Sequence, residues 1–183
     1  MRNHRLFVIF LVSMAGAIAL ANFLVTKQIN NWLTWASFTY PLVFLITDLS
    51  NRLLGLKAAS KIVLLGFCCG VLLSFISAPA RIAMASGSAF LLAGVINLFV
   101  FDKLRTVNIW WLAPISSSAA ASLLDTFIFF ALAFIGTQVP WVSLAIGDLG
   151  IKLLMVIIFL PLYKLALNRI LPPINTPNNI ALS

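Results

Sequence analysis

The stretch that decides the fold is WWLAPISSSAAASLLDTFIFF, residues 110–130. Two tryptophans open it, and their amphipathic rings favour the interface between membrane and water. Pro114 follows at a position typical of a first helical turn, where its missing N–H does little harm. Apart from Ile115, the next eight residues are all serine or alanine, which are small enough for a neighbouring helix to approach closely. The stretch predicts a membrane helix that packs tightly against other helices.

Asp125 lies deep inside this predicted helix. A carboxylate at that depth costs about 2.5–3.5 kcal/mol on scales of membrane insertion unless it faces protein, water or a ligand. Two explanations stay open. Either hydroxyl groups and a neighbouring helix cap the carboxylate, or the carboxylate faces a ligand.

The composition indicates an integral membrane protein. Of the 183 residues, 62% are hydrophobic and only 9% are charged, whereas soluble domains contain about 25% charged residues. Mean hydropathy is +1.10. The net charge of +8 is explained by basic loops, so no nucleic-acid partner is expected. Cys68 and Cys69 are adjacent in an apolar run and predict no disulfide.

Six apolar runs approach the roughly 20 residues that span the hydrocarbon core of a bilayer. They are Leu6–Val25, Ala36–Leu54, Ile62–Ala78, Ile82–Phe101, Trp110–Ile135 and Pro140–Leu165. The connections are too short for a soluble domain. Residues 1–171 are therefore predicted to form one all-α domain, a bundle of six transmembrane helices. Residues 172–183 are polar and rich in proline, and we expect a disordered cytoplasmic tail.

The basic residues of the loops predict the orientation in the membrane. Two of them, Lys27 and Arg81, fall on one side, and nine fall on the other: Arg2, Arg5, Arg52, Lys57, Lys61, Lys103, Arg105, Lys164 and Arg169. Because cytoplasmic loops collect lysine and arginine, both termini are predicted to be cytoplasmic. The alternative is a cleaved signal peptide ending near Ala21, which would leave five spans.

Three of the four aspartates lie inside predicted spans, and the chain has no glutamate. Asp48 and Arg52, and likewise Asp148 and Lys152, are four residues apart, so ion pairs within each helix are the structural alternative. At a rise of 1.5 Å per residue, the predicted topology places Asp48 and Asp148 roughly 10–15 Å below the outer surface, with Asp125 near the membrane centre. We therefore expect these aspartates to share one cavity that opens to the outside.

Carboxylates accept hydrogen bonds and suit a ligand rich in N–H groups, and neighbouring phenylalanines can sandwich a flat ring. The candidate substrate-binding residues are Asn22, Phe44, Asp48, Ser122, Asp125, Phe129, Asp148 and Lys152. Three aspartates against one lysine leave a formal charge of −2. A cationic ligand, a protonated aspartate, or Arg52 or Arg81 reaching into the cavity stay open as explanations. No metal site and no cofactor are expected.

The sequence does not indicate an enzyme. The only histidine, His4, precedes the first span, which excludes a serine–histidine protease within the membrane. Residues around Asp48 and Asp125 do not favour an aspartyl protease, which needs two facing carboxylates. The chain has no glycine-rich phosphate-binding loop with a lysine, so we expect no hydrolysis of ATP by this chain itself.

Several motifs recur together in order along the chain. They are FTYPLVFLITDL at 38–49, VFDKLR at 100–105, WWLAP at 110–114, Leu124-Asp125-Thr126 followed by Phe129-Phe130, and Asp148 with Lys152 before FLPLY at 159–163. On these motifs the chain, over about residues 20–165, resembles the queuosine precursor transporter family, also called the vitamin uptake transporter family. It differs from the family pattern at Gly94 and Asn97, where that pattern has glutamine and aspartate.

The resemblance implies a bacterial inner-membrane importer for salvage of precursors of the tRNA base queuosine. Such precursors are 7-cyano- and 7-aminomethyl-7-deazaguanine, or queuine. It also implies a fold similar to the substrate-binding subunits of energy-coupling-factor importers. A subunit of such an ATP-driven vitamin importer is therefore the alternative. Proton coupling, a homo-oligomer and an energising partner all stay open.

Overall fold

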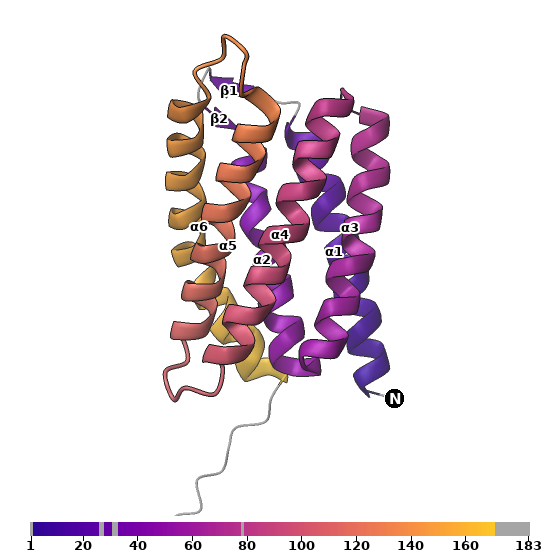
Figure 1. The fold of residues 1–183 in the computed structure, drawn as a ribbon. Coiled ribbons are helices and arrows are strands. Elements are labelled where there is room, and N and C mark those ends of the chain that lie inside the picture. Colours follow the sequence, from indigo (N-terminus) through magenta and orange to yellow (C-terminus); the bar gives the residue numbers. More distant parts are fainter. Residues whose placement is uncertain (1, 26–27, 31–32, 78, 171–183) are drawn as a thin grey trace, which may run out of the picture.

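The computed structural model describes residues 2–25, 28–30, 33–77 and 79–170. Six long helices make up most of this part: α1 (Arg2–Val25), α2 (Ala36–Leu54), α3 (Leu56–Ser77), α4 (Ala80–Leu104), α5 (Leu112–Phe134) and α6 (Trp141–Ile170). Figure 1 shows them running up and down side by side as one bundle. The predicted all-helical bundle is confirmed. The tail predicted for 172–183 lies outside the described residues.

A short hairpin between α1 and α2 was not predicted. Strands β1 (Gln28–Asn30) and β2 (Leu33–Thr34) pair antiparallel at the upper end of the bundle in Figure 1. Strands of three and two residues are too short to leave the alternating pattern by which a strand is recognised in a sequence.

Helix boundaries differ from the predicted spans mainly where turns are tight. The connection between α2 and α3 is the single residue Gly55, whose φ of +83° favours glycine, so α3 begins at Leu56 rather than Ile62. The helix predicted to begin at Trp110 begins at Leu112, after a turn that holds both tryptophans. The Trp110 ring lies under the ammonium of Lys164, 4.7 Å from its centroid.

In the described part of the chain, five of the six helices are long and apolar enough to cross a membrane by length and composition alone, and α2 is the exception. The reason is its position, since α2 contacts each of the other five helices. A helix surrounded by protein can carry polar groups that lipid would not tolerate. Four polar residues within one short stretch of α2 are buried: Thr47, Asp48, Ser50 and Asn51.

The beginning of α1 and the end of α6 lie at the same end of the bundle in Figure 1. This arrangement agrees with an even number of crossings. The cytoplasmic placement of both termini stays a prediction.

The outside of the bundle is apolar and its inside is partly polar. Large apolar side chains such as Leu72, Phe99 and Ile157 are more than 60% exposed, as expected for a surface that faces lipid rather than water. The apolar core includes Met14 and Ile62, both fully buried. In contrast, buried polar side chains gather where α2, α4, α5 and α6 meet, and this arrangement positions the candidate site.

Candidate functional site

Lys152 of α6 forms the centre of a buried ion cluster. Its Nζ lies 2.8 Å from Oδ2 of Asp125 on α5 and 2.6 Å from Oδ2 of Asp148, one turn earlier on α6. All three side chains are buried. We call Asp125, Asp148 and Lys152 the ion cluster. The spacing of four residues along α6 brings one pair together, and the packing of α5 on α6 supplies the second carboxylate.

Hydroxyl groups from two further positions complete the ion cluster. Ser37 of α2 donates a hydrogen bond of 2.5 Å to Oδ1 of Asp148. Thr126 of α5 donates one of 2.9 Å to Oδ2 of Asp148 and accepts one of 3.0 Å from Lys152. A hydroxyl can donate one proton and accept others, so Thr126 is satisfied in both roles. The cluster thus links α2, α5 and α6 and carries a formal charge of −1.

Tyr40 of α2 borders the ion cluster on one side. Its ring centroid lies 5.1 Å from Nζ of Lys152, and its hydroxyl lies near both carboxylates and forms a hydrogen bond with Ser86 of α4. The ring also makes edge contacts with Phe44 and Phe90, with centroids 6.2 Å and 6.5 Å apart. Tyr40 therefore connects the charged groups to an aromatic region.

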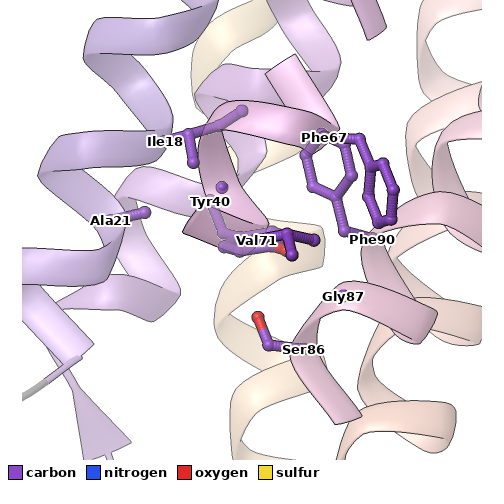
Figure 2. Close-up of a pocket in the computed structure, with 9 residues that line it drawn as sticks. Ile18, Ala21, Tyr40, Phe67, Val71, Ser86, Gly87 and Phe90 are labelled. Carbon is purple, nitrogen blue, oxygen red and sulfur yellow. The ribbon is translucent and has the colours of Figure 1, made fainter. Parts of the chain in front are cut away.

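That aromatic region contains a small pocket between α1, α2, α3 and α4 (Figure 2). It is lined by Ile18, Ala21, Tyr40, Phe67, Gly70, Val71, Ser86, Gly87 and Phe90. The rings of Phe67 and Phe90 are nearly parallel, inclined by 23° with centroids 6.4 Å apart, as Figure 2 shows. The pocket offers about 20 Å³, which is room for about one water molecule.

Asp48 lies at a second, separate position in the bundle. Ser117 and Ser118 of α5 donate hydrogen bonds of 3.0 Å and 3.1 Å to its two oxygens. Because Ser118 and Asp125 are seven residues apart on one helix, the two carboxylates are about 10 Å apart along the axis of α5. A cavity of about 10 Å³ adjoins Asp48 and is lined mainly by apolar residues of α2, α5 and α6.

The prediction of one shared depth for the aspartates is therefore wrong for Asp48. From the beginning of its helix, Asp48 is about 18 Å along α2, whereas Asp148 is about 10 Å along α6. Both helices begin at the same end of the bundle (Figure 1). Asp48 therefore lies farther along the bundle from that end than Asp148 does.

The remaining predicted site residues are spread over the bundle. Phe44 packs with Ala93 and Ala121. Ser122 is buried, and its Oγ has no hydrogen-bond partner among the described residues. Phe129 makes its ring contacts with Phe130 and Phe134. Asn22 belongs to α1, but its side chain lies outside the part of the chain that the structure describes. Among the predicted residues whose side chains are described, ion pairs join Asp125 and Asp148 through the ammonium of Lys152.

Three alternatives left open by the sequence are now decided. The Asp148–Lys152 pair within α6 is confirmed. The prediction of an ion pair between Asp48 and Arg52 is wrong, because the Arg52 guanidinium instead donates to the Arg105 carbonyl. Asp125 is capped by a neighbouring helix as that alternative expected, but the capping group is the ammonium of Lys152 on α6 rather than a hydroxyl.

Arg81 does not enter the site either. It donates hydrogen bonds to the carbonyls of Leu132 and Ile135 at the end of α5. Arg81 therefore does not neutralise the formal charge of −1 on the ion cluster.

Sequence reasoning missed Ser37, Tyr40 and Phe67. A signal for the first two exists, because Ser37, Tyr40 and Phe44 are three or four residues apart and so lie on one face of α2. No such pattern links Phe67 to Phe90, since the two rings come from different helices.

A bundle of apolar helices around a buried polar interior defines this chain as a multi-pass membrane protein. Over residues 34–80 and 74–166 it matches the family described as "putative vitamin uptake transporter", and the chain belongs to that family. Its members are transporters, and the expectation that the chain is not an enzyme is confirmed.

Three relatives extend the comparison. A "probable queuosine precursor transporter" of Haemophilus influenzae is 32% identical over 75% of this chain and 70% of its own length. The "queuosine precursor transporter" of Escherichia coli is 31% identical over 75% and 74%. A "probable queuosine precursor transporter" of Bacillus subtilis is 28% identical over 85% and 82%.

No solved structure matches the chain significantly. The predicted likeness to the substrate-binding subunits of energy-coupling-factor importers therefore stays a prediction.

Proposed function

We propose that this chain imports a queuosine precursor of the 7-deazaguanine type across the bacterial inner membrane. The names of its relatives give the substrate class. The observation that carries the proposal is the buried ion cluster, which Tyr40 joins to a pocket with two nearly parallel phenylalanine rings. In a membrane bundle, buried ionisable groups of this kind are associated with substrate or ion pathways.

The chemistry of the ligand fits these groups. A guanine-type ring has an edge with adjacent N–H donors beside a carbonyl acceptor. One carboxylate can accept two parallel N–H donors, and an ammonium can donate to the carbonyl. Asp125, Asp148 and Lys152 supply both kinds of partner. The rings of Phe67 and Phe90 supply flat apolar surfaces for the heterocycle.

The pocket must open before such a ligand can enter. A volume of about 20 Å³ is far below the roughly 300 Å³ of an ordinary ligand pocket. Gly70 and Gly87 line the pocket, and without side chains there α3 approaches Ile18 of α1 and α4 approaches Val71 of α3 closely. The proposal therefore includes a movement of α3 and α4 away from α2, which exposes the face of Tyr40.

Within this proposal, the eight predicted binding residues have different roles. Asp125, Asp148 and Lys152 contact the polar edge of the substrate. Phe44 packs edge-on against the ring of Tyr40 and holds it in position. Ser122 and Phe129 stay candidate substrate contacts, as does Asn22, whose side chain is not described, and Asp48 stands apart at its separate position.

The function is tested in a bacterial strain that lacks both its own precursor synthesis and its own importer. The strain expresses this chain and receives 7-cyano-7-deazaguanine, 7-aminomethyl-7-deazaguanine or queuine at low concentration. Queuosine in tRNA is then measured. We expect queuosine with at least one precursor, and none without the chain. Absence of queuosine with all three, while the protein is present in the membrane, contradicts the proposal.

The alternative of a subunit in an ATP-driven importer requires a separate test. Purified protein is placed in liposomes with no other protein, and entry of the labelled precursor is followed. Uptake by this chain alone excludes an obligate energising partner.

A further inference from the structure

The carboxylate of Asp48 is enclosed by protein on every side and has a relative exposure of only 1%. Ser117 and Ser118 each have one hydroxyl proton to donate to it. Asn97 of α4 lies close enough to interact with the same carboxylate. The polar partners of Asp48 are thus neutral groups from α4 and α5.

No cation faces Asp48 from the helices packed around it, as far as the chain is described. On α2, Arg52 is turned toward the Arg105 carbonyl. At the end of α4, Asp102 pairs with Arg105, which follows the helix, while Lys103 is exposed and Arg81 donates to the end of α5. On α5 the facing residues are the two serines. On α6, the group within electrostatic range is the phenol of Tyr163. An ionised carboxylate without a cation in such a place costs several kcal/mol.

Asn97 provides a second, independent observation. It is fully buried, and among the described residues neither its amide nitrogen nor its amide oxygen has a hydrogen-bond partner of normal geometry. An ionised carboxylate only accepts hydrogen bonds, whereas a protonated one also has an O–H to donate. The amide oxygen of Asn97 is an acceptor that can receive this O–H. Asn97 can thus donate an N–H to the ionised carboxylate or accept the O–H of the protonated one, so the site can hold Asp48 in both forms, as a proton-binding site requires.

A proton also fits the site better than a sodium ion. The cavity beside Asp48 has a volume of about 10 Å³, and most of its lining is apolar: Pro41, Leu45, Pro114, Val156, Phe159 and Leu160. Hard metal cations need several oxygen ligands around them, and this lining offers few. A proton needs only the carboxylate and one acceptor.

We infer that Asp48 is a proton-binding site, about two helical turns from the ion cluster, and that it takes up and releases a proton during each transport cycle. The proton binds when the site is open to the outside and leaves when it is open to the inside, so that proton and substrate move in the same direction. The coupling rests on the proposed import function. The binding of a proton by Asp48 does not.

Proton binding is measured first, without transport. The chain has four aspartates and no glutamate, so isotope-labelled aspartate gives side-chain carboxyl signals in infrared spectra that arise from those four residues alone. We expect a band of a protonated carboxyl group that changes with pH in wild type. It is absent in Asp48→Asn and unchanged in Asp102→Asn, which alters the partly exposed aspartate paired with Arg105. If wild type shows no such pH-dependent band, or if Asp48→Asn retains it, the inference is overturned.

Coupling is then measured in liposomes with labelled 7-cyano-7-deazaguanine. We expect an inward proton gradient to accelerate uptake by wild type and Asp102→Asn several-fold. Asp48→Asn resembles the protonated form, so it should exchange substrate without a gradient yet show no acceleration. Equal acceleration in wild type and Asp48→Asn contradicts coupling through Asp48. A wild type that exchanges none of the precursors contradicts the import function instead, and the infrared measurement then decides by itself whether Asp48 binds a proton.

Discussion

The ammonium of Lys152 lies 2.8 Å from the carboxylate of Asp125 across the interface between α5 and α6. These residues are 27 positions apart in the chain, and Lys152 also holds Asp148. One cation shared by two carboxylates leaves a buried charge of −1. In the proposed function, this charge provides carboxylate oxygens that accept hydrogen bonds from the substrate.

Replacing Lys152 with methionine leaves two buried carboxylates without their cation. Removing one partner of a buried ion pair costs about 3–5 kcal/mol. We expect the free energy of unfolding in detergent to fall by about that amount. Lys61→Met, which alters an exposed lysine of α3, is the control and should leave stability nearly unchanged. Equal stability of both variants would show that the cluster is not ionised.

Asp125→Asn keeps the size of the side chain and leaves Lys152 paired with Asp148. The variant should fold, because no charge loses its only partner. Affinity for the deazapurine should fall about tenfold, which corresponds to about 1.4 kcal/mol, because one carboxylate acceptor is lost. Calorimetric titration of the purified protein measures this. Wild-type affinity in folded Asp125→Asn rules out contact between Asp125 and the ligand.

Asp148→Asn and Lys152→Gln, made singly and together, test whether the pair within α6 is self-contained. For an isolated pair, the double change restores most of the stability that either single change removes. Here the double variant leaves Asp125 buried without its ammonium. We therefore expect incomplete restoration in denaturant unfolding. Full restoration would indicate that Asp125 does not depend on Lys152.

Tyr40→Phe removes the hydroxyl that lies between the ion cluster and Ser86 and keeps the ring contacts with Phe44 and Phe90. A hydrogen bond contributes about 0.5–1.5 kcal/mol, so we expect up to about tenfold weaker substrate binding with little change in stability. Tyr163→Phe is the matched control, because its ring pairs with Phe101 away from the ion cluster. If the control weakens binding equally, the effect of Tyr40 is not local.

Gly94→Ala tests the close approach of α3 and α4. A Cβ at this position would lie 2.9 Å from Cγ1 of Val63, and overpacking of this kind costs about 1–3 kcal/mol. Gly150→Ala, where nothing lies within 4 Å, should be neutral or stabilising. Thermal unfolding of both variants in detergent compares them. An unaltered unfolding midpoint for Gly94→Ala would mean that α3 can move away from the added Cβ without loss of stability.

The sequence by itself determined the helices, because long apolar runs leave no other way to satisfy the backbone in lipid. It also identified the buried aspartates as unusual, and it placed Asp148 and Lys152 on one face by their spacing of four residues. The bounds of α2 were predicted to the residue. Local chemistry suffices for these features, since each depends only on neighbours within a few turns.

Only the tertiary structure decided which polar groups meet. Asp125 pairs with Lys152 of another helix. Asp48 accepts hydrogen bonds from serines that are 69 and 70 residues away in the chain. Both depend on how far each helix is shifted along its neighbour, which side-chain packing sets and no periodic pattern encodes. The same packing puts α2 at the centre, where protein instead of lipid surrounds its polar residues. The expected single cavity is divided into an ion cluster and a separate carboxylate for this reason.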